Sequence, residues 1–115
     1  MIETRDNELV PNMYRAAINP AQIAKDLRRA ERALAPDVVR IRYTLDDDWT
    51  GDPSIFFKVV ITDKAASQES KLGEITRRII NTVRDKVKPE ELSLNSYFNF
   101  RSLSEYNELN DPAWA

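Results

Sequence analysis

The chain contains no cysteine and no histidine. The absence of cysteine excludes disulfides, thiolate nucleophiles and zinc–thiolate sites, and the absence of histidine removes the commonest general base and metal ligand. Most familiar catalytic constellations are therefore excluded. We expect a protein without a cofactor that binds another molecule rather than transforms one.

Glycine is also scarce, with two residues in 115, and long apolar runs are missing. Few glycines mean few flexible joints, and no repeat or linker divides the chain. No window approaches the roughly 18 uninterrupted apolar residues that cross a bilayer. Residues 1–19 have neither the positive region nor the apolar core of a secretory signal. We therefore expect a cytoplasmic protein without membrane contact.

The residues that are present suit one α+β domain, because 42% are hydrophobic and 31% are charged. Within this single domain over 1–115 we distinguish an N-terminal arm over 1–19, a core over 20–101 and a C-terminal tail over 102–115. The arm is too apolar to stay free in water, yet it fits no clean helical or strand pattern. We expect it to wrap around another part of the assembly.

Apolar residues at helical spacing predict two helices. The first covers about Pro20 to Ala35, with Asn19 as a plausible N-cap. The second covers about Ser67 to Val87 and ends before Pro89. Each helix has one apolar stripe. The stripes consist of Ile23, Leu27, Ala30 and Leu34 in the first helix and of Leu72, Ile75, Ile79, Val83 and Val87 in the second.

Alternating apolar and polar residues predict three strands, over Val38–Leu45, Ile55–Thr62 and Leu94–Arg101. Turn-forming residues between Asp46 and Pro53 join the first two strands in a hairpin. The simplest sheet has the strand order 2-1-3, is antiparallel at both pairings and carries both helices on one face. The expected fold is a small two-layer α+β sandwich in the order helix, strand, strand, helix, strand.

The sheet face turned away from the helices is predicted to be half basic and half aromatic or aliphatic. It consists of Arg40, Arg42, Phe56, Lys58, Val60, Tyr97 and Asn99. Such a face is unusual where only water contacts it, so we predict a partner there. Trp114 either packs on its own domain or anchors a subunit interface. The predicted partner-binding residues are Arg40, Arg42, Phe56, Tyr97 and Trp114.

The two predicted helices carry an excess of basic residues, whereas 46–63 and 89–115 are acidic. Basic helix faces suit contact with nucleic-acid phosphates or with an acidic protein. The alternative is an ordinary solvated surface, because Asp26 and Asp85 lie close enough in sequence to neutralise part of the charge. The candidate contact residues are Lys25, Arg28, Arg29, Arg32, Arg77, Arg84 and Lys88.

The predicted order of elements is similar to that of the KH-type RNA-binding module, but that module requires a GxxG loop, which this chain lacks. An RRM-like platform needs aromatic residues on two adjacent central strands. The predicted strand order places Phe56 and Tyr97 at opposite edges of the sheet. Direct RNA binding is therefore a second hypothesis.

Four aspartates lie within the seven residues from Asp46 to Asp52. Clustered carboxylates can hold Mg²⁺ for phosphoryl chemistry, with Asp46, Asp48 and Asp52 as the ligands. The alternative is a structural hairpin loop in which aspartates accept hydrogen bonds from backbone N–H groups.

These features favour a non-catalytic protein–protein interaction subunit of a small bacterial-type complex, for example an antitoxin-like or accessory subunit. Its partner is another protein or a second copy of itself, because the sheet leaves more apolar surface than a three-stranded monomer tolerates. Two alternatives stay open. One is a nucleic-acid-binding module that uses the basic helix faces, and the other is a Mg-dependent phosphoesterase on the aspartate-rich loop.

Overall fold

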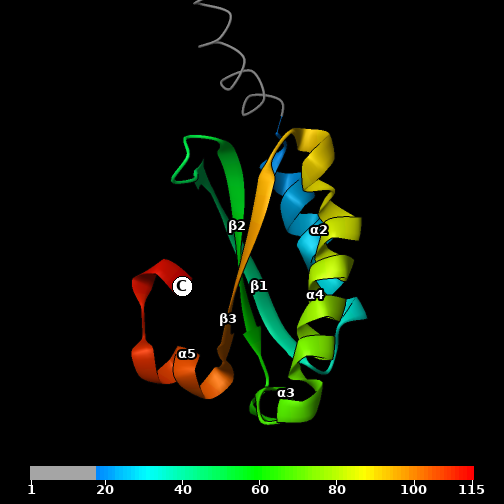
Figure 1. The fold of residues 1–115 in the computed structure, drawn as a ribbon, viewed down its shortest axis with the longest axis vertical. Coiled ribbons are helices and arrows are strands. Elements are labelled where there is room, and N and C mark those ends of the chain that lie inside the picture. The colour runs from blue at the N-terminus through cyan, green and yellow to red at the C-terminus, as the bar shows by residue number, and fades with distance from the viewer. Residues whose placement is uncertain (1–17) are drawn as a thin grey trace, which may run out of the picture.

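The computed structural model describes residues 18–115, so the predicted arm over 1–19 lies almost entirely outside the described residues. The described chain forms an α+β domain with a three-stranded mixed sheet (Figure 1). Its main elements are α2 (Pro20–Ala33), β1 (Val38–Asp47), β2 (Pro53–Ile61), α4 (Leu72–Val87) and β3 (Asn95–Ser102). The shorter elements are α3 (Asp63–Ala66), η1 (Glu69–Lys71), η2 (Pro89–Leu92), α5 (Leu103–Leu109) and η3 (Pro112–Trp114).

The strand order is β1-β2-β3, which corrects the predicted order 2-1-3. β1 and β2 pair antiparallel as a hairpin, whereas β2 and β3 pair parallel. The prediction of two antiparallel pairings is wrong because α4 carries the chain back along the sheet, so that β3 starts at the same end as β2. β2 is central, and its burial on both faces fits that position.

α2 and α4 pack side by side on one face of the sheet, as predicted, and α5 with the C-terminal residues lies on the other face (Figure 1). α2 begins at the predicted cap, where Asn19 Oδ1 accepts a hydrogen bond from the backbone N of Gln22 at 3.2 Å. Pro20 follows in the first turn, where no helical hydrogen bond is lost. Across the described range, no helix has the length and apolar character that crossing a membrane requires.

The core lies between the two helices and the inner face of the sheet. The predicted helical stripes are buried in it, except that Leu72 is only partly buried. From β2 the core receives Ile55, Phe57, Val59 and Ile61. In β1 the pairing register shifts between Val38 and Arg40. Because of this irregularity Val38 is buried and Val39 is exposed, whereas the alternation predicts Val39 on the buried face.

Candidate functional site

The outer sheet face is the surface that β1, β2 and β3 turn away from α2 and α4. The strand pairing arranges its side chains in rows that cross the sheet. The first row is Thr44, Phe56 and Tyr97, the second is Arg42, Lys58 and Asn99, and the third is Arg40, Val60 and Arg101. The C-terminal segment covers the third row, and the β1–β2 loop stands beside the first.

The cover over the third row consists of residues that follow β3. Arg40 Nη1 donates a hydrogen bond to Tyr106 Oη at 2.5 Å, and its guanidinium carbon lies 5.1 Å from the Tyr106 ring centroid. The Arg101 guanidinium lies 4.4 Å from the Trp114 ring centroid. Trp114 is 7% exposed and Val60 is 1% exposed. Two of the predicted partner-binding residues therefore have contacts within the chain: Arg40 contacts Tyr106, and Trp114 packs against Arg101.

Three carboxylates hold the C-terminal segment in place. Asp63 accepts hydrogen bonds from the backbone N and the hydroxyl of Ser104, and these bonds lower the pKa of the Asp63 carboxyl. Glu105 accepts from the backbone N of Ser102 in a capping box, which lowers the pKa of Glu105.

The third carboxylate belongs to Asp111, at the far end of the same segment. It accepts a hydrogen bond from the backbone N of Ala113 and, at 3.3 Å, another from Arg101 Nη2. Its pKa is lowered chiefly by the Ala113 bond, and the charges of Arg101 and Lys58 act in the same direction. Asp111 therefore neutralises part of the positive charge at this end of the outer face.

Asp48 organises the β1–β2 loop at the other end of the face. Its Oδ1 accepts hydrogen bonds from the backbone N and hydroxyl of Thr50 and from the backbone N of Asp52. Its Oδ2 accepts from Tyr97 Oη at 2.7 Å and from Asn95 Nδ2 at 3.3 Å. These bonds, led by that of the Thr50 hydroxyl, hold the pKa of the Asp48 carboxyl far below its ordinary value.

Both carboxylate oxygens of Asp48, a predicted magnesium ligand, accept hydrogen bonds from the protein. The structure does not gather Asp46, Asp48 and Asp52 into a metal-binding cluster, and residues 18–115 contain no group of three or more acidic side chains placed to hold a metal ion. Both oxygens of Asp48 are used by the loop and by β3 instead. The geometry corresponds to the structural hairpin loop that was the alternative interpretation.

Three aromatic rings form a cluster next to this loop. Phe56 and Tyr97 are directly paired across β2 and β3, and their stacked rings have centroids 5.2 Å apart and planes 21° apart. The Trp49 ring centroid also lies 5.2 Å from that of Tyr97, and Trp49 is 80% exposed. The prediction that Phe56 and Tyr97 lie at opposite edges is wrong, because β2 and β3 are neighbours.

Two basic residues lie beside the ring cluster in the second row. Arg42 and Lys58 are directly opposite each other on β1 and β2. Like charges in this position repel each other. The Arg42 side chain is 52% exposed and has one carboxylate near it, Glu31 Oε2 at 3.9 Å. Arg42 Nη1 also donates to the carbonyl oxygen of Ile41 at 3.3 Å, and the charge of Lys58 acts on the Asp111 carboxyl. Carboxylates therefore offset part of the positive charge of both cations.

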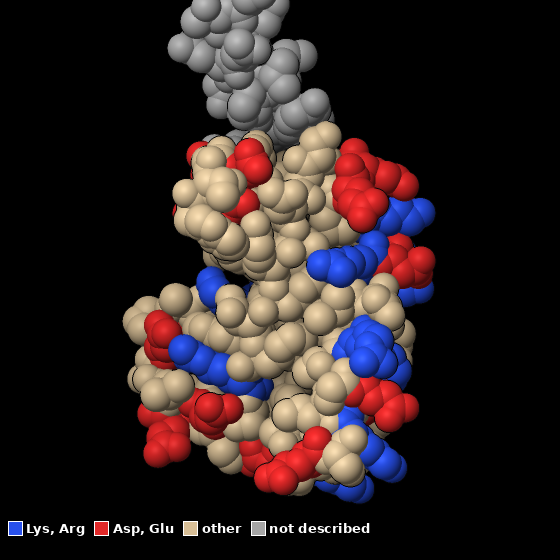
Figure 2. Space-filling view, in the orientation of Figure 1, with Lys and Arg blue, Asp and Glu red and all other residues tan. Residues whose placement is uncertain are grey.

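We use the name open patch for the part of the outer sheet face and its loop that the C-terminal segment leaves uncovered. It consists of Arg42, Thr44, Trp49, Phe56, Lys58, Tyr97 and Asn99. The surface is hollowed between the two ends of the face, and basic side chains lie in and beside the hollow (Figure 2). The sequence predicts Arg42, Phe56 and Tyr97 as partner-binding residues and places Lys58 and Asn99 on the same face, whereas it assigns Trp49 only to the hairpin loop.

The basic residues of the helices do not form one continuous surface. Arg28 lines a hollow at the β1 edge, whereas Arg84 and Lys88 line a groove of about 800 Å³ beside β3. That groove also carries the acidic residues Asp85, Glu90 and Glu91. Within the described chain, no hydrogen bond or ion pair is made by the side chains of Lys25, Arg28, Arg32, Arg77 and Lys88.

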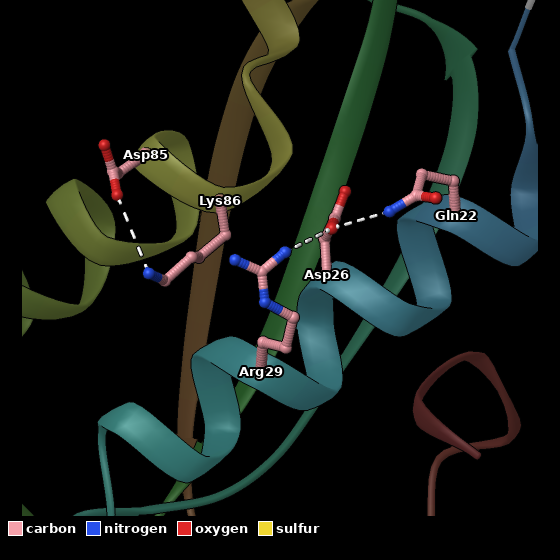
Figure 3. Close-up of polar contacts among 5 residues, drawn as sticks. All are labelled: Gln22, Asp26, Arg29, Asp85 and Lys86. Carbon is pink, nitrogen blue, oxygen red and sulfur yellow. Dashed lines mark hydrogen bonds and ion pairs between the residues drawn. The ribbon is translucent and has the colours of Figure 1, made fainter.

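Other cations of this layer are paired. Arg29 Nη1 lies 3.2 Å from Asp26 Oδ1, and Lys86 Nζ lies 3.8 Å from Asp85 Oδ2. Figure 3 shows Asp26 and Arg29 rising from α2 toward α4, while Lys86 points from α4 toward α2. Gln22 Nε2 donates to the same Asp26 oxygen at 2.9 Å. The contacts of Arg29 and Gln22 with Asp26 therefore lie within α2.

Comparison with known proteins adds no relative: no protein-family model and no curated protein matches this chain.

Proposed function

We propose that this protein is a non-catalytic interaction subunit that holds its partner on the open patch. The observation that carries the proposal is the cluster of Trp49, Phe56 and Tyr97 beside the cations Arg42 and Lys58. Aromatic rings and arginine are enriched where proteins bind other molecules, because they combine large contact area with directional polar contacts. An 80% exposed tryptophan gains burial only when something covers it.

The charge arrangement supports the same proposal. Arg42 and Lys58 are directly opposite each other on two strands, an unfavourable placement of like charges that Glu31 and Asp111 offset only in part. Sequences depart from such local rules mainly at functional sites. By contrast, Arg40 and Arg101 have aromatic and polar neighbours within the chain, so these two cations have a structural role.

The chemistry of the neighbouring carboxylates supports a binding role rather than catalysis. The chain has no histidine or cysteine to act as a base or a nucleophile. Asp48 stays ionised and accepts hydrogen bonds from the loop, so it is a weak base. The proposed phosphoesterase activity has no support from the positions of the aspartates.

The proposal is tested by affinity purification of the tagged full-length chain from extracts of cells that naturally make it. The patch variant combines Trp49→Ala with Lys58→Glu. The matched control combines Leu109→Ala with Arg77→Glu, which likewise removes one exposed apolar side chain and reverses one cation outside the patch. Circular dichroism first establishes that both variants are folded.

We expect the wild-type chain and the control to retain the same stoichiometric companion and the patch variant to lose it. Mass spectrometry and nucleic-acid staining, with and without nuclease treatment, identify the companion. A patch variant that retains every companion of the wild-type chain would show that the proposal is wrong.

A further inference from the structure

Tyr97 and the backbone of the loop are held in place in the ring cluster of the open patch, whereas the Trp49 side chain is largely exposed. Tyr97 is fixed by its hydrogen bond to Asp48 and by the Phe56 ring stacked beside it. Trp49 sits in a loop closed by two backbone hydrogen bonds, from Asp48 N to Asp52 O and from Gly51 N to Asp48 O, and Gly51 supplies the positive φ of 88°. A rigid aromatic surface can stack a flat ligand with little loss of side-chain entropy.

The charges around the patch define where an anion fits. The loop end carries the exposed carboxylates Asp46 and Asp52, and the opposite end carries Asp111. Between these acidic ends lies the second row, where Arg42 and Lys58 face each other. The favourable place for a bound anion on the open patch is therefore the second row, which runs across the strands.

A flat π face next to a narrow cationic band is what single-stranded nucleic acid requires, since every base can stack on an aromatic ring while the phosphates stay within reach of basic side chains. We propose, on the basis of the function proposed above, that the partner held on the open patch is single-stranded nucleic acid. A base stacks on Trp49, and the adjoining phosphate lies on Lys58, while Arg42 stays at the β1 edge of the same row with Glu31 and the Ile41 carbonyl. Asn99 is the third residue of the second row, and its amide can donate a hydrogen bond to the sugar–phosphate backbone of the nucleic acid.

Duplex nucleic acid fits this surface less well. A duplex presents phosphates over a broad area and is bound by wide basic surfaces. Here the band is only one row deep, and carboxylates flank it on both sides. The bases of a duplex are also stacked on each other, so their faces are not accessible to Trp49.

Fluorescence anisotropy of end-labelled oligo(dT) and oligo(U), each about 16 nucleotides long, tests the proposal with the full-length protein. We expect binding at about 50 mM salt with a dissociation constant below ~100 μM and steep weakening as salt rises. Trp49→Ala should weaken binding about tenfold, whereas Trp49→Phe keeps a ring and should stay within about threefold of the wild type.

The charge is tested separately from stacking. Lys58→Gln should lower the slope of log affinity against log salt by about 0.7, which corresponds to one lost phosphate contact on a single strand. Arg77→Gln is the matched control, because it removes one cation from α4 and should leave the slope unchanged. Equal effects of the two variants, or an unchanged affinity for Trp49→Ala, would overturn the proposal.

The outcome is distinguishable from that of the function proposed above. If neither oligonucleotide binds up to ~100 μM protein while the patch variant loses a protein companion from nuclease-treated extract, the patch binds a protein and only the nucleic-acid assignment is overturned. If neither oligonucleotide binds and the patch variant keeps every companion, both proposals are overturned. A labelled duplex that binds as tightly as the single strands would also contradict the proposed stacking on Trp49.

Discussion

At the scale of single residues, Asp48 joins two parts of the chain that are distant in sequence. Its carboxylate accepts hydrogen bonds from the loop at Thr50 and Asp52 and from β3 at Asn95 and Tyr97. The same contacts raise the pKa of the Tyr97 hydroxyl, chiefly through its hydrogen bond to Asp48. The position of the ring cluster therefore depends on one ionised carboxyl group.

This dependence predicts a loss of stability in acid. Because the pKa of Asp48 is lower in the folded chain than its ordinary value of 3.8, the folded state binds a proton less tightly than the unfolded state. The stabilisation is complete above that ordinary value and is lost as the pH falls through the lowered pKa. We expect the urea midpoint to fall steeply below about pH 4, and less steeply in Asp48→Asn.

The control for this prediction is Asp85→Asn, which removes a carboxylate from the exposed side of α4. This variant should follow the wild-type pH dependence, because an exposed pair contributes little. If Asp48→Asn and the wild type had parallel acid profiles, the network around Asp48 would not be what stabilises the loop.

The role of a single residue can be predicted from the sequence only where its hydrogen-bond partners are close in the sequence. Aspartates between two strands predict a loop that caps its own backbone, and Asp48 does so. The bond from Tyr97 depends on β3 lying next to β2, which no local pattern encodes. Trp49 is exposed because it lies in the turn between β1 and β2, outside the paired strands.

At the scale of elements, β1 is an edge strand, and side chains form hydrogen bonds with its outer backbone groups at Ile41. The backbone N of Ile41 donates to Glu31 Oε2 at 2.7 Å, and Arg42 Nη1 donates to the carbonyl of Ile41 at 3.3 Å. Charged side chains over an edge hinder the addition of another strand. α2 thereby contributes to keeping β1 from pairing with a second chain.

Removal of this guard should favour self-association. In Glu31→Ala the N–H of Ile41 becomes free, and the loss of the carboxylate also removes a charge that an incoming strand would have to displace. We expect a larger dimer fraction at equal concentration in sedimentation velocity. Glu74→Ala, on the exposed side of α4, should sediment as the wild type, and equal behaviour of both variants would contradict the guarding role.

The elements themselves follow from the sequence, but their order in the sheet does not. Caps, stripes and alternation depend on neighbours within a few residues, and they are confirmed at Asn19 and along α4. Strand order depends on contacts between distant segments. The sequence does contain evidence that β2 is the central strand. Phe56 and Val60 make its second face apolar as well, which is typical of a strand buried on both faces.

At the scale of the whole molecule, the two tryptophans have opposite roles. Trp114 is buried on the outer sheet face against Arg101, whereas Trp49 is exposed next to Tyr97. Burial of a large ring stabilises the segment that carries it. The C-terminal residues are therefore part of the folded domain and determine how much of the outer face stays open.

This contrast predicts unequal costs of truncation. Trp114→Ala should lower the free energy of unfolding by up to about 3 kcal/mol, because a buried ring is replaced by a cavity or by water. Trp49→Ala should cost less than about 1 kcal/mol, since it removes one exposed ring contact. Urea titrations followed by circular dichroism measure both values. Equal losses would show that the two rings contribute alike to the fold.

The parallel pairing of β2 with β3 has a consequence for biosynthesis. A nascent chain presents β2 with one side unpaired until residues 95–102 have left the ribosome, since the hairpin alone satisfies only the β1 side. During that interval the strand is open to pairing with other polypeptides, which makes early engagement by a chaperone advantageous. Tyr97 lies on the last strand, so the open patch is complete only after this exposed stage has passed.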